Sequence, residues 1–84
     1  MTNYIVPQNV DISDSGFLFQ PATGESYTLN EIGKLIFKML QSNSSGEQII
    51  EKVCEEYDAE AKSVERDLED FITQLKHYSL LKLS

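Results

Sequence analysis

Hydrophobic positions alternate with polar ones in the first third of the chain and follow a helical spacing afterwards. The alternation over residues 10–13 predicts a short edge strand. Residues 17–20 and 26–29 predict two further strands, rich in aromatic and β-branched side chains. Residues 14–16 and 21–24 separate the three runs and carry the Gly and Pro residues typical of tight turns.

The loop at 21–24 determines how the second and third strands pair. If these four residues form a simple hairpin loop, Leu18 lies opposite Tyr27. Because side chains alternate across a strand, the two faces of the sheet then carry different residues. The expected sets are Leu18, Tyr27 and Leu29 on one face, and Phe17 and Phe19 on the other, with Phe19 opposite Ser26. Both faces therefore carry large apolar groups.

A capped amphipathic helix is predicted directly after the third strand. Asn30 is a strong N-cap, since its side chain can accept a hydrogen bond from a free N–H of the first turn. One apolar stripe follows at helical spacing and comprises Ile32, Leu35, Ile36, Met39 and Leu40. Gly33 costs this helix about 0.5–1 kcal/mol relative to Ala, and we interpret it as a position where another backbone comes close.

Two more helices are predicted after a short polar loop. Ser44 or Ser45 can cap the second helix, and residues 44–47 match a capping box. The third helix is expected to begin after Glu60 and to run to about residue 78. The side chains expected to face inward are Ile49, Ile50, Val53, Cys54 and Tyr57 in the second helix, and Val64, Leu68, Phe71, Ile72 and Leu75 in the third.

The order of the predicted elements indicates the fold class. Residues 1–9 are expected to be irregular, and residues 80–83 form a short extended tail. Three strands followed by three helices indicate an α+β fold of winged-helix type, with a three-stranded antiparallel sheet followed by a three-helix bundle. Because 84 residues supply only one small core, we expect a single domain over residues 1–84.

The chain is acidic, with 14 acidic and 7 basic residues and a formal net charge of −7. This charge repels nucleic-acid phosphates and anionic membrane surfaces, so neither partner is expected. The charge favours a basic or apolar partner, and the alternative is that it serves solubility alone. Cys54 is the single cysteine, which excludes an internal disulfide framework and indicates a reducing compartment. The sequence shows no signal peptide and no apolar run of about 20 residues, which predicts a cytoplasmic protein.

Candidate catalytic groups are few, and each has a structural explanation. Cys54 falls on the apolar side of the second helix, where a thiol behaves as a small hydrophobe. His77 falls in the last turn of the third helix, where positive charge complements the helix dipole. Asp67 and Asp70 lie one turn apart, which is typical of a solvated face. The sequence has neither clustered metal ligands nor a glycine-rich phosphate loop, so we expect no enzyme, no metal and no cofactor.

Two further classes of small domain are disfavoured by particular residues. An acyl or peptidyl carrier is also short and acidic, but it attaches phosphopantetheine to a Ser in an Asp-Ser-Leu motif that opens a helix. The only Asp-Ser pair here is Asp14-Ser15, which is followed by Gly16 and precedes a strand. A winged-helix DNA reader needs a basic recognition helix, whereas residues 60–77 hold five acids against three Lys and Arg residues.

Taken in order, a set of residues over about 10–83 resembles the PqqD family, named after the small protein of pyrroloquinoline quinone biosynthesis. The matching residues are Thr23, Gly24, Tyr27, Thr28, Leu29, Asn30, Gly33, Ile36, Phe37, Met39, Leu40, Glu56, Tyr57, Asp58, Asp67, Phe71, Leu75, Leu80 and Leu81. The chain departs from the family at Ser79, where a Gly is usual, and at Ser26, where a second aromatic residue is frequent.

The resemblance implies a stand-alone adaptor that binds the leader of a ribosomally made precursor peptide. It implies presentation of that leader to a modifying enzyme, such as a radical SAM protein or a leader peptidase. The leader would add as a strand along the third strand and lie against the third helix, taking affinity from main-chain hydrogen bonds and specificity from alternating pockets. The expected peptide-binding residues are Glu25, Ser26, Tyr27, Thr28, Leu29, Val64, Asp67, Leu68, Asp70 and Phe71. The alternative for the third helix is that Val64, Leu68 and Phe71 belong wholly to the core and that Asp67 and Asp70 are simply solvated.

Charged and apolar residues outside this edge suggest further contacts. Asp67 and Asp70 are placed to meet a Lys or Arg of the leader. Phe17 and Phe19 lie on the sheet face that the helices cannot cover, and we hypothesise that they dock the modifying enzyme or a second copy of the chain in a homodimer. The alternative hypothesis is a general protein–protein interaction domain of winged-helix shape without a leader peptide as ligand.

Overall fold

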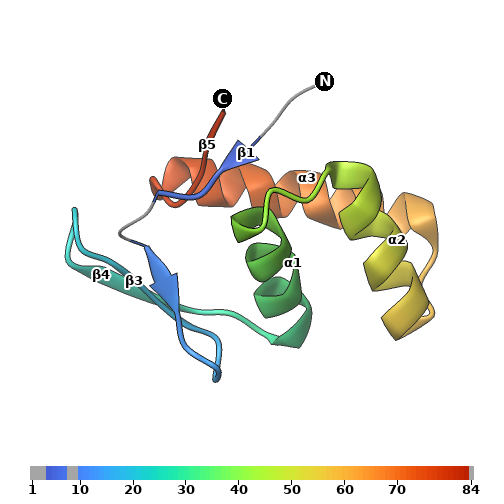
Figure 1. The fold of residues 1–84 in the computed structure, drawn as a ribbon, viewed down its shortest axis with the longest axis horizontal. Coiled ribbons are helices and arrows are strands. Elements are labelled where there is room, and N and C mark those ends of the chain that lie inside the picture. Colours follow the sequence, from blue (N-terminus) through green and yellow to red (C-terminus); the bar gives the residue numbers. More distant parts are fainter. Residues whose placement is uncertain (1–3, 8–9, 84) are drawn as a thin grey trace.

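Figure 1 shows a small sheet at one end of the molecule and three helices beside it. The computed structural model describes residues 4–7 and 10–83. The strands are β1 (Tyr4–Ile5), β2 (Asp11–Ile12), β3 (Phe17–Gln20), β4 (Glu25–Thr28) and β5 (Lys82–Leu83). The helices are α1 (Glu31–Gln41), α2 (Gly46–Tyr57) and α3 (Ala61–His77). The predicted α+β fold is confirmed, with its three-stranded antiparallel sheet followed by three helices.

The three-stranded sheet has β3 in the middle, with β2 and β4 at its edges. Leu18 pairs with Tyr27 and Phe19 pairs with Ser26, as the length of the hairpin loop predicted. Leu18 is fully buried, whereas Phe17 and Phe19 are 50% and 47% exposed. The core therefore lies on the Leu18 face of the sheet, and the Phe17 face is open.

The two ends of the described chain form a second, two-stranded sheet. The expectation of an irregular N-terminal segment is wrong for Tyr4–Ile5, because these residues form β1 and pair antiparallel with β5. The expected extended tail is thus a strand whose partner is β1. The same expectation also covers residues 1–3 and 8–9, which lie outside the described residues. Because β5 pairs with β1, the tail does not occupy the edge of β4.

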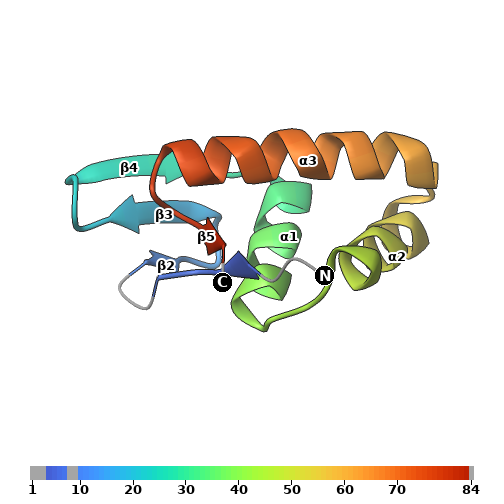
Figure 2. The same ribbon diagram turned by 90° about the horizontal axis from the view of Figure 1, so that it is seen from above.

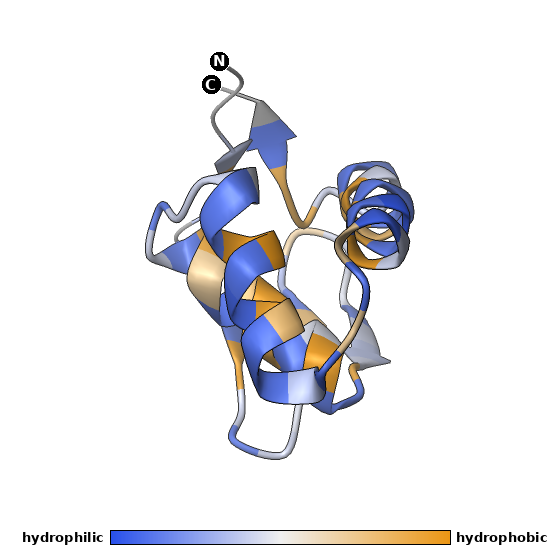
Figure 3. Cartoon of the chain, turned by 90° about the vertical axis from the view of Figure 1, so that its right-hand side faces the viewer, coloured by the Kyte–Doolittle hydropathy of each residue, from blue (hydrophilic) through white to orange (hydrophobic). Residues whose placement is uncertain are grey.

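The core lies where the helices meet the inner face of the sheet. Its buried side chains are Val10, Leu18, Ile36, Phe37, Leu40, Ile49, Val53, Val64, Leu68, Ile72, Leu75, Leu80 and Leu81. In Figure 3 the hydrophobic segments of the helices turn toward one another and the hydrophilic segments turn outward. This arrangement removes the apolar side chains from water, which is the main contribution to stability in a small domain.

The buried face of α1 is rotated relative to the predicted stripe. Its buried residues are Gly33, Ile36, Phe37 and Leu40. Ile32, which was predicted to face inward, is 38% exposed. The prediction was wrong here because the apolar residues of α1 fit two overlapping stripes, and only packing against the rest of the core selects the stripe that contains Gly33 and Phe37. Tyr57 was also predicted to be inward, but it is the last residue of α2 and is 40% exposed.

Side chains satisfy the free N–H groups at the starts of α1 and α2. The Gly33 N–H donates to Asn30 Oδ1 at 2.8 Å, which confirms the predicted cap. In α2 the capping box joins Ser45 and Gln48, one residue later than the predicted box at 44–47. Gln satisfies the same geometry as Glu in this motif, which is why the sequence allowed both registers.

Gly16, rather than Gly33, is the position of closest backbone approach. A Cβ at Gly16 would lie 2.5 Å from the main-chain oxygen of Leu29, and the residue has φ +86°. At Gly33 the nearest atoms to a Cβ belong to side chains, and the closest is Asn30 Oδ1 at 3.2 Å. The contact between Gly16 and Leu29 therefore sets the path of the chain from β4 into α1.

Helix α3 ends in a Schellman motif. The Leu80 N–H donates to the Leu75 carbonyl at 2.8 Å, and the Ser79 N–H donates to the Lys76 carbonyl at 3.1 Å. Ser79 has φ 60°, in the left-handed region that favours glycine. The buried Gln20 side chain joins this turn to β3, because its Nε2 donates to the Ser79 carbonyl at 2.6 Å.

Replacing Ser79 with Gly is expected to stabilise the protein by about 0.5–1 kcal/mol, because Gly adopts positive φ without the steric cost of a Cβ. For a domain of this size that gain raises Tm by about 2–8 °C, measurable by thermal unfolding. Ser79→Ala is the control, since it keeps the strain and should not raise Tm. A lower Tm for Ser79→Gly than for the parent chain would contradict this account of the helix end.

Candidate functional site

Strand β4 offers an open edge. In the described residues it pairs with β3 alone. The Leu29 N–H donates to the Gly16 carbonyl at 2.8 Å, so Leu29 directs its main chain toward β3. Because the direction alternates along an antiparallel strand, Tyr27 also faces β3, whereas Ser26 and Thr28 direct their N–H and C=O groups outward. The free edge thus carries two donors and two acceptors.

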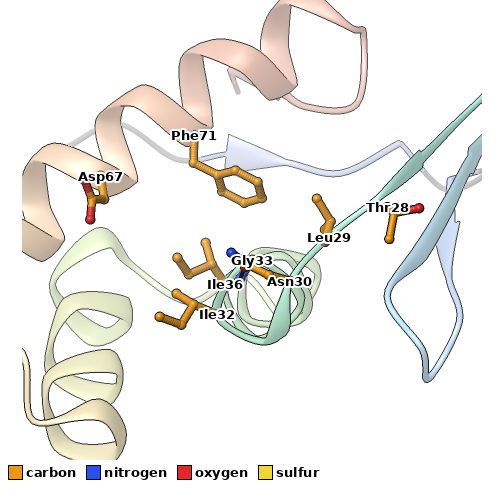
Figure 4. A pocket seen from close by; sticks show the side chains of 8 residues that line it. All are labelled: Thr28, Leu29, Asn30, Ile32, Gly33, Ile36, Asp67 and Phe71. Carbon is orange, nitrogen blue, oxygen red and sulfur yellow. Dashed lines mark hydrogen bonds between the residues drawn. The ribbon is translucent and has the colours of Figure 1, made fainter.

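A groove lies beside this edge, between α3 and the junction of β4 with α1. It encloses about 360 Å³ and is lined by Thr28, Leu29, Asn30, Ile32, Gly33, Ile36, Asp67 and Phe71. Figure 4 shows Phe71 extending from α3 toward Leu29 and Gly33, with Asp67 farther along the same helix. The missing side chain of Gly33 leaves the floor open, since a Cβ there would lie 3.7 Å from Phe71 Cζ.

A smaller hollow continues the groove toward the end of α3. It holds about 130 Å³ and is lined by Leu18, Tyr27, Thr28, Leu29, Phe71, Gln74, Leu75, Tyr78 and Leu80. Thr28, Leu29 and Phe71 line both spaces. Figure 2 shows the C-terminal part of α3 lying beside β4. The two hollows therefore form one mainly apolar depression that follows the open strand.

The Tyr27 side chain forms part of the wall of the smaller hollow. Its ring packs against Tyr78 with centroids 4.8 Å apart. Its hydroxyl is buried and makes no well-formed hydrogen bond within the described residues. Burial raises the pKa of Tyr27 above its ordinary value of 10.0, and the nearby carboxylate of Glu25 raises the pKa further. Both effects favour the neutral phenol.

The structure brings together four of the residues expected at the peptide site. Thr28, Leu29, Asp67 and Phe71 line the main groove, and Tyr27 lines its continuation. Glu25 and Ser26 are exposed on β4. Asp70 is exposed one turn from Asp67 and does not line either hollow.

Two expected wall residues belong to the core instead. Val64 and Leu68 are only 5% and 4% exposed, and neither lines the groove. They face the core because α3 turns that stripe toward the other helices, which leaves Phe71 and Asp67 on the border facing β4. The prediction that Val64 and Leu68 face inward is confirmed. The sequence also named them as wall residues because periodicity does not separate the buried centre of a stripe from its margin.

Several groove residues were not expected from the sequence. They are Asn30, Ile32, Gly33 and Ile36 at the start of α1, and Gln74, Tyr78 and Leu80 near the end of α3. The sequence did contain a signal for the first group, because Ile32 places an apolar side chain directly beside Gly33, which has no side chain. It was missed because Ile32 was assigned to the core.

Of the described residues that line the main groove, Asp67 is the one that carries a charge. Among the described residues, no Lys, Arg or His forms an ion pair with it. The carboxylate of Asp67 is exposed, so it is available to a cationic group of a ligand. The rest of the lining is apolar or neutral.

The remaining candidate chemistry stays dispersed. Cys54 is a free, half-buried thiol on α2. Within residues 4–7 and 10–83, no three His, Cys, Asp or Glu side chains gather in a way that would hold a metal ion. In the same residues, no helix has the length and apolar content needed to cross a membrane.

These observations define a small winged-helix-like domain with an open strand edge and an adjoining apolar groove, a class suited to binding extended chains. The model of the family described as coenzyme PQQ synthesis protein D (PqqD) matches residues 16–81. The chain therefore belongs to the PqqD family.

Two solved structures share this fold. One is TbiB1 in complex with the TbiA(beta) leader peptide, with 30% identity, a TM-score of 0.84, and coverage of 92% of this chain and 93% of that chain. The other is lasso peptide synthetase B1 complexed with the leader peptide, with 24% identity, a TM-score of 0.83, and coverage of 94% and 96%. At 24% identity the likeness shows the fold alone. Among curated proteins, none matches the sequence.

Proposed function

We propose that this protein binds the leader region of a ribosomally synthesised precursor peptide and presents it to a modifying enzyme, without catalysing a reaction itself. The leader adds as a strand to β4 and lies against α3. The enzyme served is a radical SAM protein, a leader peptidase or another enzyme of precursor modification. The observation that carries the proposal is the open edge of β4 beside the groove.

The main-chain groups of the edge provide the affinity that does not depend on leader sequence. Ser26 and Thr28 each direct one donor and one acceptor outward, as the pairing of Leu29 with Gly16 requires. A strand placed along β4 satisfies these groups while adding a fourth strand to the sheet. This mode of recognition is common where a domain must hold an extended peptide.

The groove provides the selectivity. Every second side chain of an added strand points into the depression between β4 and α3, where Leu29 and Phe71 favour apolar groups. Asp67, with Asp70 one turn farther along α3, favours a Lys or Arg of the leader at one end. The preferred ligand is therefore an extended segment that carries alternating apolar side chains and a basic residue.

The family of this chain and one similar solved structure support this reading. Membership of the PqqD family and 30% identity with TbiB1, which was solved in complex with the TbiA(beta) leader peptide, both favour a leader as the ligand. In the part of the chain that the structure describes, the groove lining is mainly apolar, and the single Cys and the single His lie on different helices, α2 and α3. This arrangement does not pair a nucleophile with a base.

Fluorescence anisotropy with a labelled leader tests the proposal. The probe is the leader of a precursor encoded beside the gene of this chain, with the TbiA(beta) leader as a comparator. Saturable binding of the cognate leader is expected, and a scrambled leader of equal composition should bind at least about tenfold more weakly, a difference of about 1.4 kcal/mol. Equal binding of both peptides would show that the interaction depends only on charge and amino-acid composition, which would contradict the proposal.

Replacing Gly33 with Ala is expected to weaken leader binding while leaving stability nearly unchanged. The added methyl group enters the groove floor between Leu29 and Phe71. Helix propensity favours Ala by about 0.5–1 kcal/mol, which offsets the tight 3.2 Å contact with the cap oxygen of Asn30. Anisotropy and thermal unfolding measure the two effects separately.

The matched control for this test is Gly46→Ala. A Cβ at Gly46 meets nothing within 4 Å, and the residue starts α2, away from the groove lining. Its leader affinity should equal that of the parent chain. If Gly33→Ala binds the leader as tightly as Gly46→Ala does, the floor at Gly33 takes no part in binding.

A further inference from the structure

The outer face of the three-stranded sheet carries two exposed aromatic side chains with polar residues around them. Phe17 and Phe19 lie on the central strand and are 50% and 47% exposed. The residues paired with them are exposed and polar, namely Thr28, Ser26 and Asp11. Exposed aromatic groups of this kind mark contact surfaces on small proteins.

Negative charge predominates beside this face. Residues 1–33 contain no Lys or Arg, and Asp11 lies on the face beside Phe19. Two Lys residues of α1 are already engaged near the turn that precedes β3. The Lys34 Nζ contacts the Asp14 carbonyl at 2.6 Å and Glu31 at 3.4 Å, and the Lys38 Nζ lies 3.8 Å from the Asp14 carboxylate. A second copy of this chain placed face to face would therefore oppose acid to acid, whereas a basic surface would complement it.

The face is too small to hold a partner alone. Two half-exposed phenylalanines offer on the order of 200 Å² of aromatic surface, whereas a stable interface buries about 800 Å² on each partner. The missing surface lies next to the face. A strand added to β4 directs every second side chain to the same side as Phe17, Phe19, Ser26 and Thr28.

We propose that the Phe17–Phe19 face docks the enzyme that modifies or cleaves the precursor, through an apolar surface rimmed by Lys or Arg. The outward side chains of the bound leader complete this docking surface. The proposal rests on the proposed function, because the leader supplies part of the interface. The enzyme then contacts the adaptor and its cargo together and prefers the loaded adaptor to the empty one.

The experiment compares two kinds of binding for one variant. The probes are the leader named above and the purified modifying enzyme encoded in the same gene cluster. The double variant Phe17→Ser and Phe19→Ser should bind the leader within about twofold of the parent chain, because neither side chain lines the groove. Its association with the enzyme, measured by calorimetry with leader present, should weaken at least about tenfold.

Two further variants keep the result interpretable. Tyr57→Ser removes another exposed aromatic side chain, 40% exposed at the end of α2, and should leave enzyme association unchanged. Asp11→Lys reverses the charge of an exposed residue beside Phe19. It also removes the hydrogen bond from the Ile12 N–H to Asp11 Oδ1 at 2.9 Å, but it changes no buried side chain, so thermal unfolding should show a folded protein. It should weaken association, and added salt should weaken association of the parent chain.

Each outcome decides between the proposals. Unchanged enzyme association in both the double variant and Asp11→Lys would overturn the docking proposal while leaving leader binding intact. Sedimentation that shows a parent-chain dimer, lost in the double variant, would assign the face to a second copy and also overturn it. Failure of the parent chain to bind the leader would instead refute the proposed function.

Discussion

The variant Thr28→Pro should lose leader binding while keeping its fold. Thr28 directs its N–H away from β3 toward the open edge, as inferred from the Leu29–Gly16 hydrogen bond. Proline is tolerated at such edge positions because no hydrogen bond within the sheet is lost. With Pro at position 28, however, an added leader strand meets no N–H donor there. One carbonyl of the leader then stays unpaired, which costs about 1–3 kcal/mol. The dissociation constant should therefore rise about 10- to 100-fold.

Thr28→Ala is the matched control for this prediction. It removes the side chain, which lies on the outer face with Phe17, and keeps the main-chain donor. Leader affinity should fall by less than about threefold, a few tenths of a kcal/mol. Anisotropy measures both variants, and thermal unfolding verifies that both are folded. Equal affinities for Thr28→Pro and Thr28→Ala would mean that β4 receives no added strand.

Gly16→Ala is expected to cause a large loss of stability, although it adds only one methyl group. Two costs add at this position. Ala at φ +86° carries a steric penalty of about 1–2 kcal/mol. In addition, its Cβ would lie 2.5 Å from the Leu29 carbonyl oxygen, which forces the β4–α1 junction to move. The free energy of unfolding should fall by about 3 kcal/mol or more, a large part of the stability of a small domain.

Gly24→Ala separates these two costs. Gly24 has φ +77°, close to that of Gly16, but a Cβ there meets nothing within 4 Å. Its free energy of unfolding should fall by about 1–2 kcal/mol only, from the backbone conformation. Urea denaturation gives both values. Equal losses at Gly16 and Gly24 would show that the contact with Leu29 relaxes freely and does not hold the groove in place.

Local patterns were sufficient to predict most of the fold. The four-residue loop at 21–24 specified the pairing of Leu18 with Tyr27, and alternation then placed Phe17 and Phe19 on the open face. Asn30 predicted the start of α1, because its side chain can accept a hydrogen bond from the first turn of a helix. These features depend on residues only a few positions apart, where stereochemistry leaves few alternatives.

What the sequence did not reveal depends on distant contacts. The strand at Tyr4–Ile5 exists because β5 pairs with it, and two residues carry no periodicity of their own. The rotation of α1 around Phe37, and the absence of Val64 and Leu68 from the groove wall, depend on how the helices meet. Periodicity identifies an apolar stripe, but only tertiary packing decides which edge of the stripe stays open as a groove.

Amide hydrogen exchange along β4, with and without leader peptide, tests the central claim most directly. In the free protein the N–H groups of Ser26 and Thr28 should exchange quickly, whereas that of Tyr27 is protected by β3. Saturation with leader should slow exchange at Ser26 and Thr28 by at least about tenfold, as expected for amides that gain hydrogen bonds, while Phe17 and Phe19 change little. Leader binding that leaves the Ser26 and Thr28 amides as fast as before would contradict strand addition at this edge.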